Sequence, residues 1–286
     1  MVHKRKSYYY KEKELIKSPL IHNFWRAPID NDLGFADEDL EDFDEESTHI
    51  DYSWREASIS REIVDFQFED IKPQIKRVSV SFDVLNSDEP LKLIYLIYGN
   101  GDIIIENRFI PNKEMIRFGM QCKIPKDLNQ ITWFGKGPHE TMEDRKNGAS
   151  VGLYSGNVES LIHPYIRPQE NANRTNVRWL TIQNQDHLGL LISHLNGSYL
   201  NFSSWPYSME DLEKATHTFE LPNRDFITLN IDHKQKGVGG DLPGLPSVHK
   251  KYRLRKDKVY EYRFLLRPMS EKRDFSKDPI KIPPNL

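Results

Sequence analysis

Short runs in which apolar and polar residues alternate dominate this sequence, and helical periodicity is scarce. Residues 75–84 (IKRVSVSFDV) alternate with a period of two, as a strand with one buried face does. The dense apolar run 91–98 is followed by Asn-Gly at 100–101 and by the apolar run 103–109. Asn-Gly between two such runs is one of the strongest short signals of a β-hairpin.

The same pattern continues through the second half of the chain. Asn-Gly at 196–197 lies between the runs 188–194 and 198–202, which predicts a second hairpin. Further strands are predicted at 226–231 and 259–266. Many short strands separated by Gly, Pro and Asn turns predict an all-β fold, built as a large antiparallel sandwich.

The composition supplies core material and excludes several protein classes. Among 286 residues, 14 Phe, 13 Tyr and 5 Trp accompany a charged fraction of 29%, so extensive disorder is not expected. The 40 basic and 43 acidic side chains nearly balance, which gives no reason to expect nucleic-acid binding. No run of 18 apolar residues is present, so we expect no membrane span. The single cysteine, Cys122, excludes an internal disulfide framework and a cysteine zinc site.

Three polar or charged segments are interpreted as surface. The charged residues 1–6 are not followed by an apolar segment, so we expect no signal peptide and a cytoplasmic protein. Residues 37–46 carry eight acidic side chains without the spacing of a calcium loop, which favours a solvated segment over a cation site or docking patch. The proline-rich residues 277–286 are expected to run extended over the surface.

Two sequence blocks combine aromatic, charged and glycine residues in the manner of a binding site. Residues 23–32 (NFWRAPIDND) contain Arg26, Asp30 and Asp32 beside two aromatics. An aromatic face would pack on a sugar ring; the alternative is a buried Trp–Phe anchor with the arginine paired to a carboxylate. Residues 237–244 (GVGGDLPG) lack the Gly-Lys-Ser/Thr of a phosphate-binding loop. They are interpreted as a tight turn close to a neighbouring domain.

Two further blocks carry candidate acid–base and sugar-binding groups. In residues 133–140 (WFGKGPHE), His139 next to Glu140 would form an acid–base pair if the chain turns there. The alternative is a histidine held by backbone hydrogen bonds. Residues 163–174 (HPYIRPQENANR) offer amide, carboxylate and guanidinium groups, which suit sugar hydroxyls and a structural loop network equally.

All four blocks, in this order, resemble the C-terminal β-sandwich domain of the β-galactosidases of glycoside hydrolase family 2. The similarity is carried by FWRAPxDND at 24–32, WFGxGPHE at 133–140, PxEN at 168–171 and GxGGD at 237–241. The resemblance implies a galactose-mutarotase-like supersandwich, either the last domain of a long chain or a separate small chain paired with a large one. It places this domain at 15–270, after a short lead at 1–14 without the usual first strands. An extended tail follows at 271–286.

The resemblance also implies that bond-making residues lie outside this chain. The family hydrolyses terminal β-D-galactosides with two glutamates on a (β/α)₈ barrel, one of them in an Asn-Glu dipeptide that this sequence lacks. The expected partner is therefore a β-galactosidase large chain or catalytic barrel domain that binds the galactoside substrate. The isolated chain is predicted to be inactive and without a cofactor. A Mg²⁺ or Na⁺ ion of the kind found in family active sites is expected in the partner's catalytic domain.

By resemblance, this domain forms a wall of the active-site mouth. In the family, the loop after GxGGD carries a tryptophan that stacks on substrate, and Gly244 stands at that position here. Losing the indole would weaken aglycone stacking by about 1 kcal/mol. We predict that Asp241, Leu242 and Gly244 lie in the loop nearest the substrate pocket. The residues predicted to organise the sandwich and its interface with the barrel are Arg26, Asp30, Asp32, His139, Glu140, Glu170, Asn171 and Arg174.

Two other functions are compatible with the predicted fold, because one architecture hosts unrelated functions. The first is a stand-alone mutarotase-type sugar epimerase, which needs a general acid and a general base on opposite sides of the sugar. Its candidate groups are His139, His163, Glu140 and Glu170. The second is a carbohydrate-binding module without catalytic activity. The order and content of the four blocks match the galactosidase domain rather than the epimerase pattern.

Overall fold

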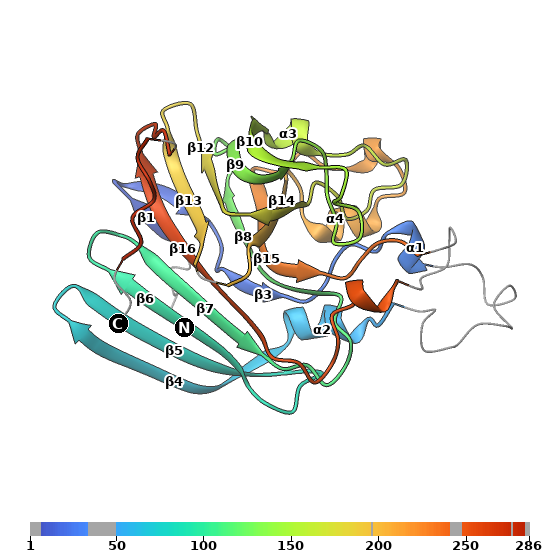
Figure 1. The fold of residues 1–286 in the computed structure, drawn as a ribbon, viewed down its shortest axis with the longest axis horizontal. Helices are drawn as coiled ribbons and strands as arrows, with labels where there is room; N and C mark the ends of the chain where they lie inside the picture. Colours follow the sequence, from blue (N-terminus) through green and yellow to red (C-terminus); the bar gives the residue numbers. More distant parts are fainter. Residues whose placement is uncertain (1–6, 34–49, 196, 241–247, 276, 284–286) are drawn as a thin grey trace, which may run out of the picture.

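A computed structural model describes residues 7–33, 50–195, 197–240, 248–275 and 277–283. Strands dominate these residues, and every strand pairing is antiparallel (Figure 1). The all-β antiparallel prediction is confirmed. The acidic residues 37–46 and the predicted loop residues Asp241, Leu242 and Gly244 lie outside the described residues.

The strands form a nine-stranded sheet, a five-stranded sheet and a two-stranded ribbon. In spatial order the nine-stranded sheet contains β10 (Ser150–Asn157), β9 (Gln130–Gly137), β12 (Trp179–Gln183), β13 (Leu188–His194), β16 (Tyr260–Ser270), β7 (Ile103–Phe109), β6 (Leu91–Tyr98), β5 (Ile75–Val84) and β4 (Arg61–Lys72). The five-stranded sheet contains β11 (Arg174–Val177), β14 (Leu200–Trp205), β15 (Phe226–Gln235), β8 (Arg117–Pro125) and β3 (Ile21–Asn23). The ribbon pairs β1 (Tyr8–Tyr10) with β2 (Lys13–Ile16).

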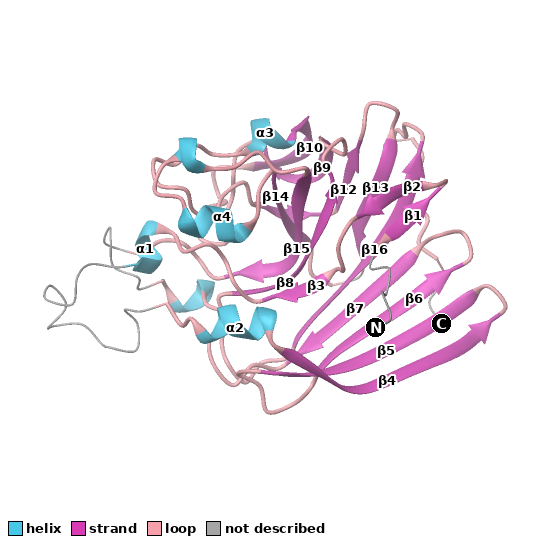
Figure 2. Cartoon of the chain, turned by 180° about the vertical axis from the view of Figure 1, so that it is seen from behind, coloured by secondary structure: helices cyan, strands magenta, loops and turns pink. Residues whose placement is uncertain are grey.

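Short helical segments join the strands and gather on one side of the molecule, next to the five-stranded sheet (Figure 2). They are α1 (Asp30–Leu33), α2 (Ser53–Ile59), α3 (Val158–Leu161), α4 (Met209–Lys214) and the 3₁₀ turns η3 (Thr218–Glu220) and η4 (Lys250–Tyr252). Among the described residues, the helices are all too short or too polar to cross a bilayer.

The first predicted hairpin is confirmed and the second is wrong. β6 and β7 pair directly, with Tyr95 opposite Ile105. β13 instead pairs with β12 and β16, whereas β14 pairs with β11 and β15 in the other sheet. The chain thus passes from one sheet to the other between β13 and β14. A turn signal specifies a local reversal, but the buried faces on either side decide which strands pair.

The two sheets enclose one core in which aromatic rings meet. Phe24 lies 4.9 Å from Phe109 and 6.0 Å from Phe118 between ring centroids. His22 is buried beside them, with Nε2 2.7 Å from Asn107 Oδ1. Burial lowers the pKa of His22 to about 3 against the opposing effect of the Asn107 hydrogen bond, so this ring is neutral at pH 7. Cys122 is also buried, and burial raises the pKa of its thiol to about 12, as expected of a core residue.

The polar side of the five-stranded sheet is buried as well. Thr228, Asn230 and Asp232 alternate with apolar residues along β15, a pattern typical of a solvent-facing side. Each of them is at most 1% exposed. Connecting segments cover this side: Thr228 Oγ1 donates to the carbonyl oxygen of Tyr207, and Trp205 Nε1 donates to that of Asn171. The sheet therefore has a second, polar interior, which contains the candidate site.

Candidate functional site

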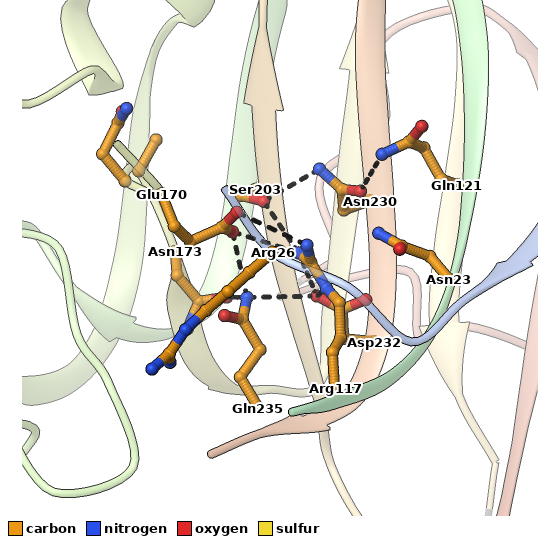
Figure 3. Close-up of polar contacts among 12 residues, drawn as sticks. Asn23, Arg26, Arg117, Gln121, Glu170, Asn173, Ser203, Asn230, Asp232 and Gln235 are labelled. Atoms are coloured by element: carbon orange, nitrogen blue, oxygen red, sulfur yellow. Dashed lines mark hydrogen bonds and ion pairs between the residues drawn. The ribbon is translucent and has the colours of Figure 1, made fainter. Parts of the chain in front are cut away.

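A buried charge cluster lies on the polar side of the five-stranded sheet (Figure 3). Arg117, near the start of β8, donates from Nε and Nη2 to Asp232 Oδ2 at 3.0 and 2.8 Å. The same Nη2 lies 3.2 Å from Glu170 Oε1, and all three side chains are 0% exposed. Gln235 Nε2 donates to the same Glu170 oxygen at 3.1 Å. Side chains from β8, β15 and the 163–174 block are thereby joined around one guanidinium.

The electrostatics of this cluster follow from burial with two acids and one base. Burial raises the pKa of Glu170 and of Asp232, and the charge of Arg117 opposes both shifts. Burial acts to lower the pKa of Arg117, but the two carboxylates outweigh it and raise that pKa. Charged side chains that are removed from solvent need oppositely charged partners of this kind. Glu170 is 1% exposed, so its carboxylate is shielded from solvent and held by Arg117 and Gln235.

Close packing at the cluster requires a glycine at position 119. A Cβ on Gly119 would lie 1.8 Å from Asp232 Oδ1 and 2.9 Å from the Cα of Asp232. Gly119 and Asp232 are direct partners across β8 and β15. The glycine leaves room for the carboxylate that Arg117 binds.

A second buried ion pair holds the start of the glycine-rich block. Arg26 donates from Nε and Nη2 to Asp32 at 2.9 and 2.7 Å, in a bidentate pair with side chains 0% and 6% exposed. Its Nη1 and Nη2 also donate to the carbonyl oxygens of Lys236 and Gly237, at 2.7 and 3.1 Å. The guanidinium thus binds block 23–32 to the backbone that follows β15. Arginine suits this place because its five donors lie in a fixed fork.

Asp144 holds the same backbone from another segment. Its Oδ2 accepts hydrogen bonds from the amides of Val238 and Gly239, each at 2.8 Å. Asn31 Nδ2 donates to the carbonyl oxygen of Val238 at 2.8 Å. We call residues 236–240 with these contacts the anchored loop. Asp241, the first of the predicted substrate-loop residues, follows it directly in the sequence.

Asp30, at the surface, and Glu140, whose side chain is 8% exposed, order the surrounding loops. Asp30 accepts from Arg167 Nε at 2.7 Å and Gln169 Nε2 at 2.9 Å. Burial acts to raise the pKa of Asp30, but these hydrogen bonds and the charge of Arg167 outweigh it and lower that pKa. Glu140 accepts from the Arg145 guanidinium, from Tyr165 Oη at 2.8 Å and from the amide of Ala172 at 2.7 Å.

A cavity of about 550 Å³ opens beside Glu140. Its wall includes His139, Glu140, His163, Tyr165 and Arg174. Arg174 is 3% exposed, donates to the carbonyl oxygens of Leu161, Ala172 and Pro138, and lies over the Trp133 ring at 5.4 Å. His139 and Glu140 do share a site, because β9 ends at Gly137 and the chain turns after it. This polar cavity has an aromatic edge and a volume within the range of small-molecule sites.

The predicted residues thus fall into separate groups. Arg26 and Asp32 hold the anchored loop, Glu170 belongs to the charge cluster, and His139, Glu140 and Arg174 line the cavity. Asp30 orders the 163–174 block from the surface, and Asn171 is buried, with Nδ2 2.8 Å from the Gln169 carbonyl oxygen. Among the described residues, no group of three or more His, Cys, Asp or Glu side chains is arranged to hold a metal ion.

Sequence reasoning missed the centre of the charge cluster. Arg117, Asp144, Asp232 and Gln235 are not among the predicted site residues. One usable signal was Arg117 itself, a charge inside the otherwise apolar run MIRFGM. Asp232 gave none, because it continues the polar alternation of β15.

Comparison with known proteins gives one family. The family model described as the β-galactosidase small chain matches residues 4–266. A β-galactosidase of Priestia megaterium is 35% identical over 268 residues, which are 92% of this chain and 24% of the relative. A β-galactosidase of Halalkalibacterium halodurans is 30% identical over 265 residues, 90% and 25% of the two chains. The chain spans about a quarter of the length of these curated relatives.

Among solved structures, a galactose mutarotase related enzyme from Lactobacillus acidophilus is similar with a TM-score of 0.34 and 10% identity. The similarity covers 72% of this chain and 71% of that one.

Proposed function

The chain belongs to the β-galactosidase small-chain family, and from this premise we propose that it is the small chain or C-terminal part of a β-galactosidase. In this proposal it shapes the mouth of an active site that hydrolyses terminal β-D-galactosides. A partner barrel supplies the two catalytic glutamates of a retaining mechanism. Any Mg²⁺ or Na⁺ ion belongs to that partner.

One observation carries the proposal: the anchored loop is held from two independent sides. Arg26 binds the carbonyl oxygens of Lys236 and Gly237, and Asp144 binds the amides of Val238 and Gly239. Both holding groups are charged, which makes their hydrogen bonds about twice as strong as neutral ones. The backbone of residues 236–240 is therefore fixed from two sides at the point where the predicted substrate loop begins in the sequence.

The acidic groups of the described site support a role without bond-making. Glu170 is buried against Arg117, and Glu140 accepts hydrogen bonds from three groups. A retaining glycosidase needs two carboxylates facing each other across the scissile bond, one of them free to attack carbon. Neither Glu140 nor Glu170 is free to attack carbon, so cleavage of the glycosidic bond is assigned to the partner.

The test is hydrolysis of a chromogenic β-galactoside by the purified chain, by a family large chain lacking this domain, and by their mixture. Activity in the mixture alone is the expected result. Activity of the chain alone would overturn the proposal and return attention to Glu140. Absence of activity in all three samples, with the large chain shown to be folded, would also contradict it.

A mutarotase-type epimerase is the second candidate, and the cavity is the observation that favours it. His139, His163 and Glu140 line one space large enough for a hexose, and ring opening requires an acid and a base. Glu170 plays no part, because it is buried in the charge cluster. The measurement is polarimetric mutarotation of α-D-galactose by the chain alone. Catalysis that is lost in His139→Ala or His163→Ala would support this candidate.

A further inference from the structure

The core-facing side of the nine-stranded sheet continues beyond the core. One row of paired residues crosses the sheet from Tyr262 in β16 through Asn107, Leu93 and Val80 to Phe66 in β4. The first four are between 3% and 8% exposed, whereas Phe66 is 60% exposed. The five-stranded sheet ends at β3, and no described layer lies over β4 in either view (Figures 1 and 2).

The edge strand β4 exposes several apolar side chains, although six of its twelve residues are charged. Phe68 lies on the same side as Phe66, opposite Val78, and is 57% exposed. Ile63 and Val64 are 59% and 53% exposed. Natural sheets protect a long edge with charges, proline or a covering segment, and apolar patches of this kind mark interaction sites. Within the described residues, β4 spans twelve residues and has a strand partner, β5, on one side alone.

Charge disfavours a second copy of this chain as the group that covers β4. The pairing that places Phe66 of each copy opposite Phe68 of the other also places Asp65 opposite Glu69. The pairing that stacks Phe66 on Phe66 places Glu62 opposite Asp70. Like charges directly opposite in a sheet are destabilising. The covering segment must therefore combine apolar side chains with neutral or basic ones.

We infer that β4 is a docking edge for the large chain of the same β-galactosidase, whose covering segment packs apolar side chains on Phe66 and Phe68. This inference rests on the proposed function. The relatives are about four times as long as this chain, so about three quarters of their length lies outside it and is available to supply the segment. On the opposite side of β4, Asp65 favours a basic residue in the covering segment, whereas Glu69 is already paired with Arg77 at 3.0 Å.

The test compares two charge-introducing double variants of the full chain. Phe66→Lys with Phe68→Lys alters the β4 edge. Val151→Lys with Leu153→Lys is the matched control on β10, the other edge strand of the same sheet, where these side chains are 44% and 62% exposed. Titration of each into the large chain, followed by galactosidase activity, gives the dissociation constant and the activity at saturation. Melting temperatures verify that the variants fold.

We expect the β4 variant to weaken association by about 30-fold or more, as loss of central aromatic contacts does, with full activity at saturation. The control variant should bind within about 3-fold of the wild type, as substitutions outside an interface do. Hydrogen exchange at residues 62–70 should slow in the complex. Unchanged affinity of the β4 variant, or an equal loss in the control, would overturn the inference while the wild-type complex still supports the proposed function. A wild-type chain that does not bind the large chain would contradict both.

Sedimentation velocity of the isolated chain tests whether a second copy of this chain, rather than the large chain, covers β4. We expect a monomer. A wild-type dimer that becomes monomeric in the β4 variant, with unchanged affinity for the large chain, would show that a second copy covers β4 and would overturn the inference.

Discussion

Asp144 occupies the space that a side chain at Gly237 would need. A Cβ at position 237 would lie 2.6 Å from Asp144 Oδ2, the oxygen that also accepts the amides of Val238 and Gly239. Gly237 is not among the described residues with positive φ, so the close approach alone requires glycine there. The two amides, which would otherwise suit a phosphate, are already used by a carboxylate of the same chain.

Replacing Asp144 by alanine should loosen the anchored loop. Two amides lose a charged acceptor, and we expect the free energy of unfolding to fall by about 1–3 kcal/mol. If the proposed function holds, KM of the reconstituted enzyme should rise more than kcat falls. Urea unfolding and steady-state kinetics measure these effects. Asp83→Ala, at an exposed position on β5, is the control, and an equal effect of both variants would contradict the special role of Asp144.

Gly119→Ala should strongly destabilise the chain. The added methyl group would lie 1.8 Å from Asp232 Oδ1, so the strands or the carboxylate must move, and overpacking of this kind costs about 1–3 kcal/mol or more. Gly148→Ala is a matched control, because a Cβ there meets nothing within 4 Å. Thermal unfolding of both variants checks this, and similar melting temperatures would refute the predicted clash.

Arg117→Met should have the largest effect of the substitutions considered. It leaves Glu170 and Asp232 buried without a cation, and breaking a buried ion pair costs about 3–5 kcal/mol. Arg108→Met is the comparison, because Arg108 is 34% exposed and lies 3.5 and 3.2 Å from Glu89 and Glu261; such surface pairs contribute about 0–1 kcal/mol. Chemical denaturation measures both, and a loss below about 1 kcal/mol for Arg117→Met would contradict the cluster's structural role.

Stability should fall as the pH drops below about 6.5, the ordinary pKa of histidine. Burial lowers the pKa of His22 to about 3 and that of His233 to about 4, so the unfolded chain binds more protons than the folded chain in this window. Each histidine then removes up to about 1.4 kcal/mol of stability per pH unit. Glu170 and Asp232 act in the opposite direction, because their pKa values are raised.

The contribution of His22 can be isolated by difference. We expect His22→Gln to be less stable than the wild type at pH 7, and its stability to depend less steeply on pH between 7 and 5. Urea unfolding at both pH values gives the comparison. An unchanged pH dependence in the variant would show that His22 is not held neutral in the folded chain.

Local patterns in the sequence predicted the class of the fold and several of its strands. Alternation along residues 75–84 and the Asn-Gly signal at 100–101 are local properties, and they predicted β5 and the β6–β7 hairpin correctly. The four blocks gave the family, because their residues and order are written in the chain.

Packing between distant segments sets which strands pair and which sides of the strands are buried. β13 and β14 flank a hairpin signal, yet they belong to different sheets. The alternation along β15 predicts Asp232 as a surface residue, but loops cover that side of the strand in the folded chain. Arg117, 115 positions away in the sequence, binds the carboxylate of Asp232 there. Alternation specifies that two sides of a strand differ, but desolvation depends on what packs against each side. The buried charge cluster and the exposed Phe66 are therefore products of packing between distant segments.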